Sequence, residues 1–227
     1  MSIIEIKGLH KVYDGKSLPV YAVNGIDIKI EAGEFTAVVG PSGSGKTTLL
    51  NIVGGLDEPT EGEVFIDGVK ITGLSGKEKT DFRMKNIGFV FQAYNLIPVF
   101  TAKENVEFIL HLQGKPKAER ERRTKELLEA VGLGDRMDSR PNKLSGGQQQ
   151  RVAVARALAS KPKFILADEP TANLDSKSTD NLLEIMEKLN REENITFLFS
   201  THDQRVVSKA RRVITIQDGV VVSDIRK

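Results

Sequence analysis

A glycine-rich turn between two apolar segments constrains the fold of this chain more than any other stretch. It fits the phosphate-loop pattern G-x-x-x-x-G-K-[ST] and reads Gly40, Pro41, Ser42, Gly43, Ser44, Gly45, Lys46 and Thr47. Glycines let the backbone turn tightly, so that successive N–H groups point at an anion. A helix that begins at Lys46 directs the positive end of its dipole at the phosphates. The motif predicts a triphosphate site, with Lys46 on the β- and γ-phosphates and the Thr47 hydroxyl on Mg²⁺.

The segments on either side of the loop support this interpretation. Residues 35–39 are β-branched and apolar, which is typical of a buried strand. Residues 47–53 are apolar at helical spacing and end at Gly54 and Gly55. A glycine–serine turn that arose by chance would lack this strand–loop–helix context. We therefore expect an α/β fold built around a phosphate loop.

Composition sets broad limits. The chain has 227 residues, 39% of them hydrophobic, which is enough for one large domain or two small ones. Its 33 Lys and Arg nearly balance 31 Asp and Glu, which argues against a nucleic-acid partner. With no cysteine, disulfides and thiolate metal sites are excluded, and a reducing compartment fits. No signal peptide or membrane span is predicted, so we expect any link to a membrane to come through a partner.

Two carboxylates follow a strongly apolar segment. Residues 164–167 read as a buried strand, and Asp168 and Glu169 stand at its end. In a phosphate-loop protein an acid at this place holds Mg²⁺. Because neighbouring strand residues point to opposite faces, Asp168 and Glu169 are expected to have different roles.

Two further polar side chains follow predicted strands. Gln92 ends the strand at 87–91, and His202 follows the strand at 195–200. Taken alone, Gln92 is more often a solvated loop residue and a lone loop histidine has no special role. Parallel strands present their carboxyl ends at one edge of the sheet, so we expect both side chains to lie near Asp168.

A second glycine-containing segment, residues 144–148 (LSGGQ), begins a helix that runs to about residue 160. Ser145 is a plausible N-cap, and Gly146 and Gly147 leave backbone N–H groups uncovered. This predicts a second anion site at a helix N-terminus. On local physics alone, an ordinary glycine-containing helix start explains the segment equally well.

The remaining elements follow from periodicity and turn residues. We expect strands at 2–7, 20–30 and 63–66, a final hairpin turning at Asp218–Gly219, and helices at 77–85, 101–113, 117–131 and 178–190. The helix at 101 has a possible Thr101–Glu104 capping box. Tyr13, between the first two predicted strands, is a candidate for stacking on a base, with an ordinary surface or core tyrosine as the alternative. Residues 93–160 are expected to form a helical subdomain inserted between 1–92 and 161–227.

Together these motifs resemble the nucleotide-binding subunit of ABC transporters over nearly the whole chain. The phosphate loop alone admits many NTPases, but its combination with residues 144–148, the strand that ends at Glu169, and His202 is specific. Ser145 follows Lys46 by 99 residues, which leaves no room for a long coiled-coil insertion. Residues 40–57, 87–92 and 142–152 resemble those of the lipoprotein-releasing and macrolide-exporting group, with peptide exporters and the cell-division cassette as close relatives.

The resemblance implies the fold and the site residues. The expected fold is a phosphate-loop ABC ATPase core with a mixed sheet, an N-terminal antiparallel β part and the inserted helical subdomain. The expected assembly is a homodimer with two MgATP bound head to tail. Adenine would stack on Tyr13, and Gly40 to Lys46, together with Thr48, would hold the phosphates. Mg²⁺ would be held by Thr47, by Gln92 and, through water, by Asp168.

The resemblance also implies the catalytic and interface roles. Glu169 would polarise the attacking water, with His202, Gln92 and Lys46 as the other catalytic groups. His202 would contact the γ-phosphate. From the opposite subunit, the segment Ser145, Gly146, Gly147 and Gln148 would approach the same phosphate. Asp175 would lie across the dimer interface.

Three functions are compatible with such a cassette. The favoured one is an ATPase that powers an integral membrane permease at the inner face of the cell membrane, with the partner docking near residues 93–100. The alternative is a signalling module of the cell-division type that transports nothing. A soluble ABC ATPase of DNA repair or translation predicts a long insertion or two cassettes, and the sequence has neither.

Overall fold

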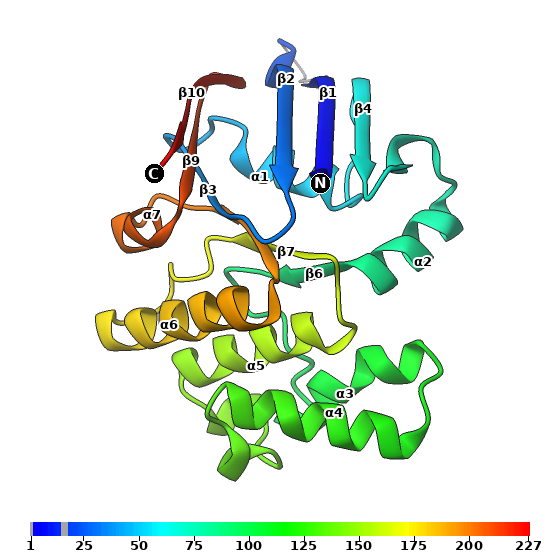
Figure 1. Ribbon diagram of the computed structural model, residues 1–227, viewed down its shortest axis with the longest axis vertical. Coiled ribbons are helices and arrows are strands. Elements are labelled where there is room, and N and C mark those ends of the chain that lie inside the picture. Colours follow the sequence, from blue (N-terminus) through cyan, green and yellow to red (C-terminus); the bar gives the residue numbers. More distant parts are fainter. Residues whose placement is uncertain (1, 15–17) are drawn as a thin grey trace.

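The computed structural model of the chain describes residues 2–14 and 18–227. Within these residues the strands form two sheets (Figure 1). The N-terminal sheet is antiparallel, in the order β2-β1-β4-β5. Its strands are β1 (Ser2–Tyr13), β2 (Val20–Glu31), β4 (Glu61–Ile66) and β5 (Val69–Lys70). The predicted antiparallel N-terminal part is therefore confirmed.

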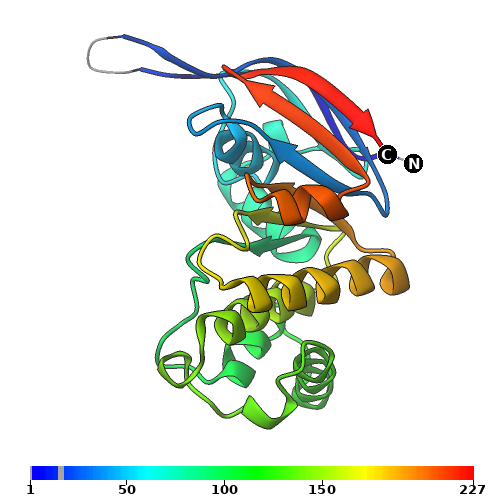
Figure 2. The ribbon, with the colours of Figure 1, turned by 90° about the vertical axis from the view of Figure 1, so that its left-hand side faces the viewer.

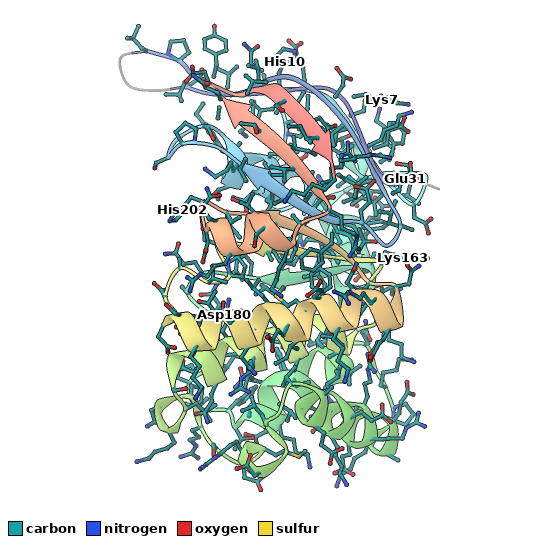
Figure 3. The ribbon with its side chains drawn as sticks, turned by 60° about the vertical axis from the view of Figure 1, so that its left-hand side comes forward. Lys7, His10, Glu31, Lys163, Asp180 and His202 are labelled. Atoms are coloured by element: carbon teal, nitrogen blue, oxygen red, sulfur yellow. The ribbon has the colours of Figure 1, made fainter. Side chains whose placement is uncertain are left out.

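The second sheet positions the residues that the sequence singled out. Its order is β10-β9-β3-β8-β7-β6, parallel throughout except for β10, which pairs antiparallel with β9. The strands are β3 (Phe35–Val39), β6 (Ile87–Val90), β7 (Phe164–Asp168), β8 (Thr196–Ser200), β9 (Arg212–Gln217) and β10 (Val220–Arg226). The parallel strands end at one edge: Val38 and Asp168 both pair with Ser200. Figure 3 shows His202 at this edge and Lys163, which precedes β7, on the opposite side.

The helices are unevenly distributed. They are α1 (Lys46–Val53), α2 (Gly76–Asn86), α3 (Ala102–Leu112), α4 (Lys117–Ala130), α5 (Gly146–Ala159), α6 (Ser176–Glu193) and α7 (Gln204–Lys209). Three of these, α3, α4 and α5, pack together at the end of the molecule away from the N-terminal sheet (Figure 1). The Thr101–Glu104 capping box of α3 is confirmed, and Ser145 caps α5 in the same way.

Two apolar clusters stabilise this arrangement. One fills the space between α1 and the two sheets, and includes Ile30, Leu49 and Ile66. The other joins α3, α4, α5 and α6 to the parallel sheet, where Phe35 packs against Phe199 with ring centroids 4.6 Å apart. The central strands β3, β7 and β8 are buried on both faces and therefore read as largely apolar runs.

Several element boundaries differ from expectation. Tyr13 does not lie between two strands: it is the last residue of β1 and pairs with Val20. Strand β6 ends before Phe91, and α6 begins two residues earlier than predicted because Asp175 caps it. The sequence analysis missed β5 and α7. Each has too few residues to show a clear period.

Candidate active site

The phosphate loop connects β3 to α1 and approaches neighbouring backbone closely. Gly45 has a φ of 101°, and a Cβ there would lie 2.0 Å from the carbonyl oxygen of Ala22. A Cβ on Gly40 would lie 2.0 Å from the carbonyl oxygen of Ile216. Any larger side chain would push the loop away from β2 and β9, so both glycines are required for its shape.

The phosphate loop surrounds the ammonium group of its own lysine, Lys46. The Lys46 ammonium donates hydrogen bonds to the carbonyl oxygens of Gly40 at 2.8 Å and Pro41 at 2.9 Å, and only 8% of the residue is exposed. Within the described chain, the buried Ser44 hydroxyl has no hydrogen-bond partner. A buried hydroxyl without a partner is costly unless a ligand completes it. The loop therefore fits a phosphate group, which both the ammonium and the hydroxyl can bind.

Thr47 and Asp168 come together from different elements. The Thr47 hydroxyl in the first turn of α1 donates to Asp168 Oδ1 at 3.2 Å, at the end of β7. Mg²⁺ in nucleotide sites is usually held by one or two such oxygens together with phosphates and water. In the described residues no cluster of three His, Cys, Asp or Glu side chains could hold a metal by itself. The Thr47–Asp168 pair is thus suited to Mg²⁺ that arrives with a nucleotide.

Glu169 faces other partners, as the alternation of strand residues predicts. Its Oε1 lies 2.7 Å from His202 Nδ1, and its Oε2 accepts a hydrogen bond from Thr201 at 3.3 Å. Its backbone has the left-handed φ of 45°, and its N–H donates to the Ser200 carbonyl at 2.8 Å. Left-handed backbone in a residue other than glycine is strained and often marks a functional site. The carboxylate is therefore held at both oxygens, one residue after Asp168 at the carboxyl edge of the sheet.

Gln92 follows β6 at the same edge. Its side chain is exposed and forms no hydrogen bond within the described residues, while its carbonyl oxygen accepts from Asn173 Nδ2 at 3.0 Å. The structure thus places Gln92 in the loop after β6, and its contact with Mg²⁺ stays a prediction.

The sequence analysis did not assign a role to Gln150, which is fully buried on α5. Its Nε2 donates to the carbonyl oxygens of Phe91 at 3.3 Å and Pro170 at 2.7 Å. These two residues neighbour Gln92 and Glu169. Gln150 therefore connects α5 to both loops of the site. The only signal in the sequence is a glutamine at a helix position that faces the core.

Ser145 and its glycines are not joined to the phosphate loop within one chain. Ser145 is exposed, and its side chain and that of Gln148 complete the capping box of α5. A Cβ on Gly146 would lie 2.8 Å from the Tyr94 hydroxyl, and a Cβ on Gly147 would lie 2.7 Å from Ser178 Oγ. Among the described residues, no hydrogen bond or ion pair links this helix start to residues 40–48. The second anion site is separate from the first in a single copy.

Tyr13 lies beside the phosphate-loop helix, near Thr48. Its hydroxyl donates to Asp57 Oδ2 at 2.6 Å, and Lys11 Nζ lies 4.7 Å from its ring centroid. Burial, followed by the bond to Asp57, raises the pKa of the Tyr13 phenol, while the nearby Thr48 side chain lowers it. Tyr13 is thus close to the helix that carries the phosphate loop, and 40% of it remains exposed.

Comparison with known proteins decides the family. The family model described as ABC transporter matches residues 23–172, which include the phosphate loop, residues 144–148, Asp168 and Glu169. The chain belongs to this family. It is an ATP-binding ABC ATPase cassette.

Individual relatives agree with this assignment. An ABC transporter ATP-binding protein of Thermotoga maritima is 49% identical over 96% of this chain and 92% of its own length. The macrolide export ATP-binding/permease protein MacB of Aggregatibacter actinomycetemcomitans is 46% identical over all of this chain, which spans 35% of that protein. The structure of the ATP-binding cassette MJ0796, in a dimeric post-hydrolysis state bound to ADP and phosphate, matches with a TM-score of 0.91. It is 44% identical, and the match covers 98% of each chain.

Within residues 2–14 and 18–227, the helices are too short or too polar to cross a bilayer.

Proposed function

We propose that two copies of this ATPase bind two MgATP head to tail and drive a membrane partner that exports or extracts its substrate. The observation that supports this best is the Glu169 carboxylate, which Thr201 and His202 hold next to the Thr47–Asp168 pair. A general base must lie close to the water that it activates, and the carboxyl edge of the sheet brings it to the phosphate loop.

Each side chain has a role in hydrolysis. Lys46 would exchange its two loop carbonyls for the β- and γ-phosphates. Thr47, Gln92 and Asp168 would hold Mg²⁺, which would neutralise phosphate charge. The oxygen of the attacking water bonds to the γ-phosphorus while Glu169 accepts a proton from that water. The bond from that phosphorus to the ADP oxygen breaks, and ADP and phosphate result. His202 leaves Glu169 to contact the γ-phosphate.

A second copy supplies the other phosphate-binding surface. The N-terminus of α5 is separate from the phosphate loop in one chain, and the backbone N–H groups of Gly146 and Gly147, in the first turn of α5, have no intrahelical acceptor. When two copies close head to tail, the γ-phosphate lies between the loop of one and the α5 N-terminus of the other, with Asp175 at the interface. The charge of the phosphate is then balanced from both sides, and hydrolysis removes this attraction. The dimeric state of MJ0796 supports this assembly.

An apolar groove beside the Gln92 loop is the proposed docking site for the membrane partner. It has a volume of about 310 Å³, and its apolar lining includes Phe89, Phe91, Phe108 and Leu112. Phe108 and Leu112 of α3 are 38% and 54% exposed. We assign it to a short amphipathic helix of an integral membrane permease, which would hold the ATPase at the inner face of the membrane. Relatives named as macrolide and pyoverdine export ATP-binding/permease proteins support this partner.

We propose that residues 93–160 act as one helical subdomain. This subdomain transmits the conformational change at the nucleotide site to the groove. Gln150 connects α5 with the Phe91 and Pro170 carbonyls, so a shift at the nucleotide reaches α3 and the groove together.

A pull-down tests the assembly. Tagged Glu169→Gln protein with MgATP serves as bait on detergent-solubilised membranes of the source organism, and co-purifying proteins are sequenced. A four-span partner with a large extracytoplasmic domain supports the export function. A division-type membrane protein, or a partner tied to cell-wall hydrolases, supports the signalling alternative. Leu112→Lys bait should lose the partner, whereas Val69→Lys bait, changed at a residue 44% exposed outside the groove, should keep it.

A further inference from the structure

Lys11, Tyr13 and Asp57 form a closed cluster at the end of β1. Lys11 Nζ donates to Asp57 Oδ1 at 2.8 Å, and the Tyr13 hydroxyl donates to Asp57 Oδ2 at 2.6 Å. The same ammonium lies 4.7 Å from the centroid of the Tyr13 ring. The carboxylate therefore binds both side chains, and the cation covers one face of the ring. Burial disfavours the charged carboxylate, but the bonds from Lys11 and Tyr13 outweigh it and lower the pKa of Asp57.

Asp57 itself is anchored to the phosphate-loop helix. The N–H groups of Leu56 and Asp57 donate to the Asn51 carbonyl of α1 at 2.8 and 3.3 Å. The following segment joins β1: Thr60 N–H donates to the His10 carbonyl at 2.8 Å, and Val12 N–H donates to Thr60 Oγ1 at 2.9 Å. Asp57 thus has a fixed position relative to both the helix and the strand. Figure 2 shows this end of β1 extending over the side where α1 begins.

We propose that Asp57 and Lys11 are positioning residues that hold the Tyr13 ring in one orientation for stacking on the nucleotide base. This inference rests on the base contact proposed for Tyr13. A tyrosine fixed only by its backbone loses rotamer freedom when a base stacks on it. Here Asp57 already binds the hydroxyl at the far end of the ring. The rotamer freedom of Tyr13 is therefore lost on folding and not on nucleotide binding. The stacking face is ready before the nucleotide arrives.

Lys11 decides which face of the ring is open. A cation within about 6 Å of a ring centroid is attracted to the π face and excludes other groups from it. Only 13% of the Lys11 side chain is exposed, and its ammonium also donates to the Glu58 carbonyl at 2.7 Å, so the cation is held in place. The base is left with the opposite face, so one stacking geometry is selected from two.

The test compares a ligand that has a base with one that lacks it. MgADP and magnesium pyrophosphate are titrated calorimetrically into the wild-type protein and the variants Asp57→Ala and Tyr13→Phe, since an ATPase consumes neither ligand. Each variant loses the same hydrogen bond and should bind ADP about three- to tenfold more weakly. Pyrophosphate affinity should stay within about twofold, which also shows that the loop is folded. Asp57→Ala combined with Tyr13→Phe should bind ADP no more weakly than Asp57→Ala alone, because Asp57→Ala already removes the hydrogen bond that Tyr13→Phe removes.

Two further variants test the role of Lys11 and the specificity of the Asp57 effect. Lys11→Met should weaken ADP about two- to fivefold through loss of the cation on the ring. Tighter ADP binding by Lys11→Met would show that the lysine blocks the face the base needs, and would overturn its role. Glu58→Gln is the matched control, because this neighbouring carboxylate pairs with Lys79 and not with Tyr13. It should bind ADP as the wild type does.

Failure of this inference is separable from failure of the base contact. Tyr13→Ala should weaken ADP and leave pyrophosphate unchanged, and an unchanged ADP affinity would reject the base contact and the inference together. If Tyr13→Ala weakens ADP but Asp57→Ala does not, positioning alone is overturned. Equal weakening of ADP and pyrophosphate by Asp57→Ala also overturns it, because the residue would then support the phosphate loop and not the ring.

Discussion

His202 and Glu169 meet at the carboxyl edge of the parallel sheet although 33 positions separate them: Nδ1 of the imidazole lies 2.7 Å from Oε1 of the carboxylate. Thr201 holds the other carboxylate oxygen, so Glu169 keeps its orientation when His202 turns toward a nucleotide. His202 is 74% exposed on its side chain and is free to do so, whereas Glu169 is 16% exposed. The proposed general base is therefore more buried than the proposed phosphate contact.

Glu169→Gln should reduce ATP turnover by about 10²-fold or more, because an amide cannot accept the proton of the attacking water. ATP binding should persist, since the phosphate loop is intact. Steady-state phosphate release and equilibrium nucleotide binding measure the two effects. Glu184→Gln, an exposed carboxylate on α6, is the control and should hydrolyse ATP normally. Near-normal hydrolysis by Glu169→Gln would reject the assignment.

His202→Ala should reduce turnover by about 10²-fold, as expected when one donor to a developing phosphate charge is removed. Its exposed side chain does not support the loop, so the fold and ATP affinity should change little. Single-turnover hydrolysis with saturating MgATP isolates this step. His111→Gln on α3 should keep full activity in the same assay, and a comparable loss there would point to a nonspecific effect.

Ser145→Arg should abolish ATP-dependent dimerisation. The long arginine side chain would occupy the space at the α5 N-terminus where the γ-phosphate bound to the other copy is proposed to lie. The monomer should still bind ATP, since Ser145 makes no contact with residues 40–48 in its own chain. Sedimentation in the Glu169→Gln background measures dimerisation. Loss of nucleotide binding by the monomer would contradict the assignment.

Mixing two inactive chains provides a further check on the same arrangement. Ser145→Arg and Lys46→Ala subunits together form a dimer with one site whose Lys46 and Ser145 both remain native. Partial recovery of hydrolysis in the mixture is expected for head-to-tail pairing. No recovery would mean that the α5 N-terminus does not act on the partner's nucleotide.

Arg212→Met should destabilise the fold by about 3 kcal/mol at pH 7, because it leaves carboxylates that were paired with a buried cation. Arg212 is 6% exposed and binds Glu34 of the β2–β3 turn and both oxygens of Asp224 on β10. Urea unfolding measures the change. Arg226→Met is the control: Arg226 pairs with Glu34 from the surface and should contribute less than about 1 kcal/mol.

The ion pair between Arg212 and Asp224 predicts that the stability of the fold depends on pH. The hydrogen bonds from Arg212 lower the pKa of Asp224, so this carboxylate stabilises the fold above its unfolded pKa of 3.8. That contribution is lost as the pH falls through the lower folded pKa. The difference in unfolding free energy between wild type and Arg212→Met should therefore shrink below about pH 3.8. A difference that stays constant to pH 2.5 would show that packing, not the ion pair, is responsible.

The site was predictable wherever its signal is local. The phosphate loop and the Ser145 cap are each contained in a short segment. Asp168, Glu169 and His202 were predictable because each follows an apolar strand, and parallel strands end at one edge of the sheet. The role of Gln150 could not be predicted, because its partners Phe91 and Pro170 belong to loops 59 and 20 positions away.

The sequence by itself determined the phosphate loop, the family and the elements long enough to show a period, since these depend on neighbours a few residues apart. Tertiary structure alone decided that Asp57 binds Tyr13 across 44 positions, that Arg212 binds Glu34 across 178, and that the α5 N-terminus lies apart from the loop in a single copy. The physical reason is that such contacts depend on the order of strands in two sheets. That order follows from packing the whole core, and no local pattern specifies it.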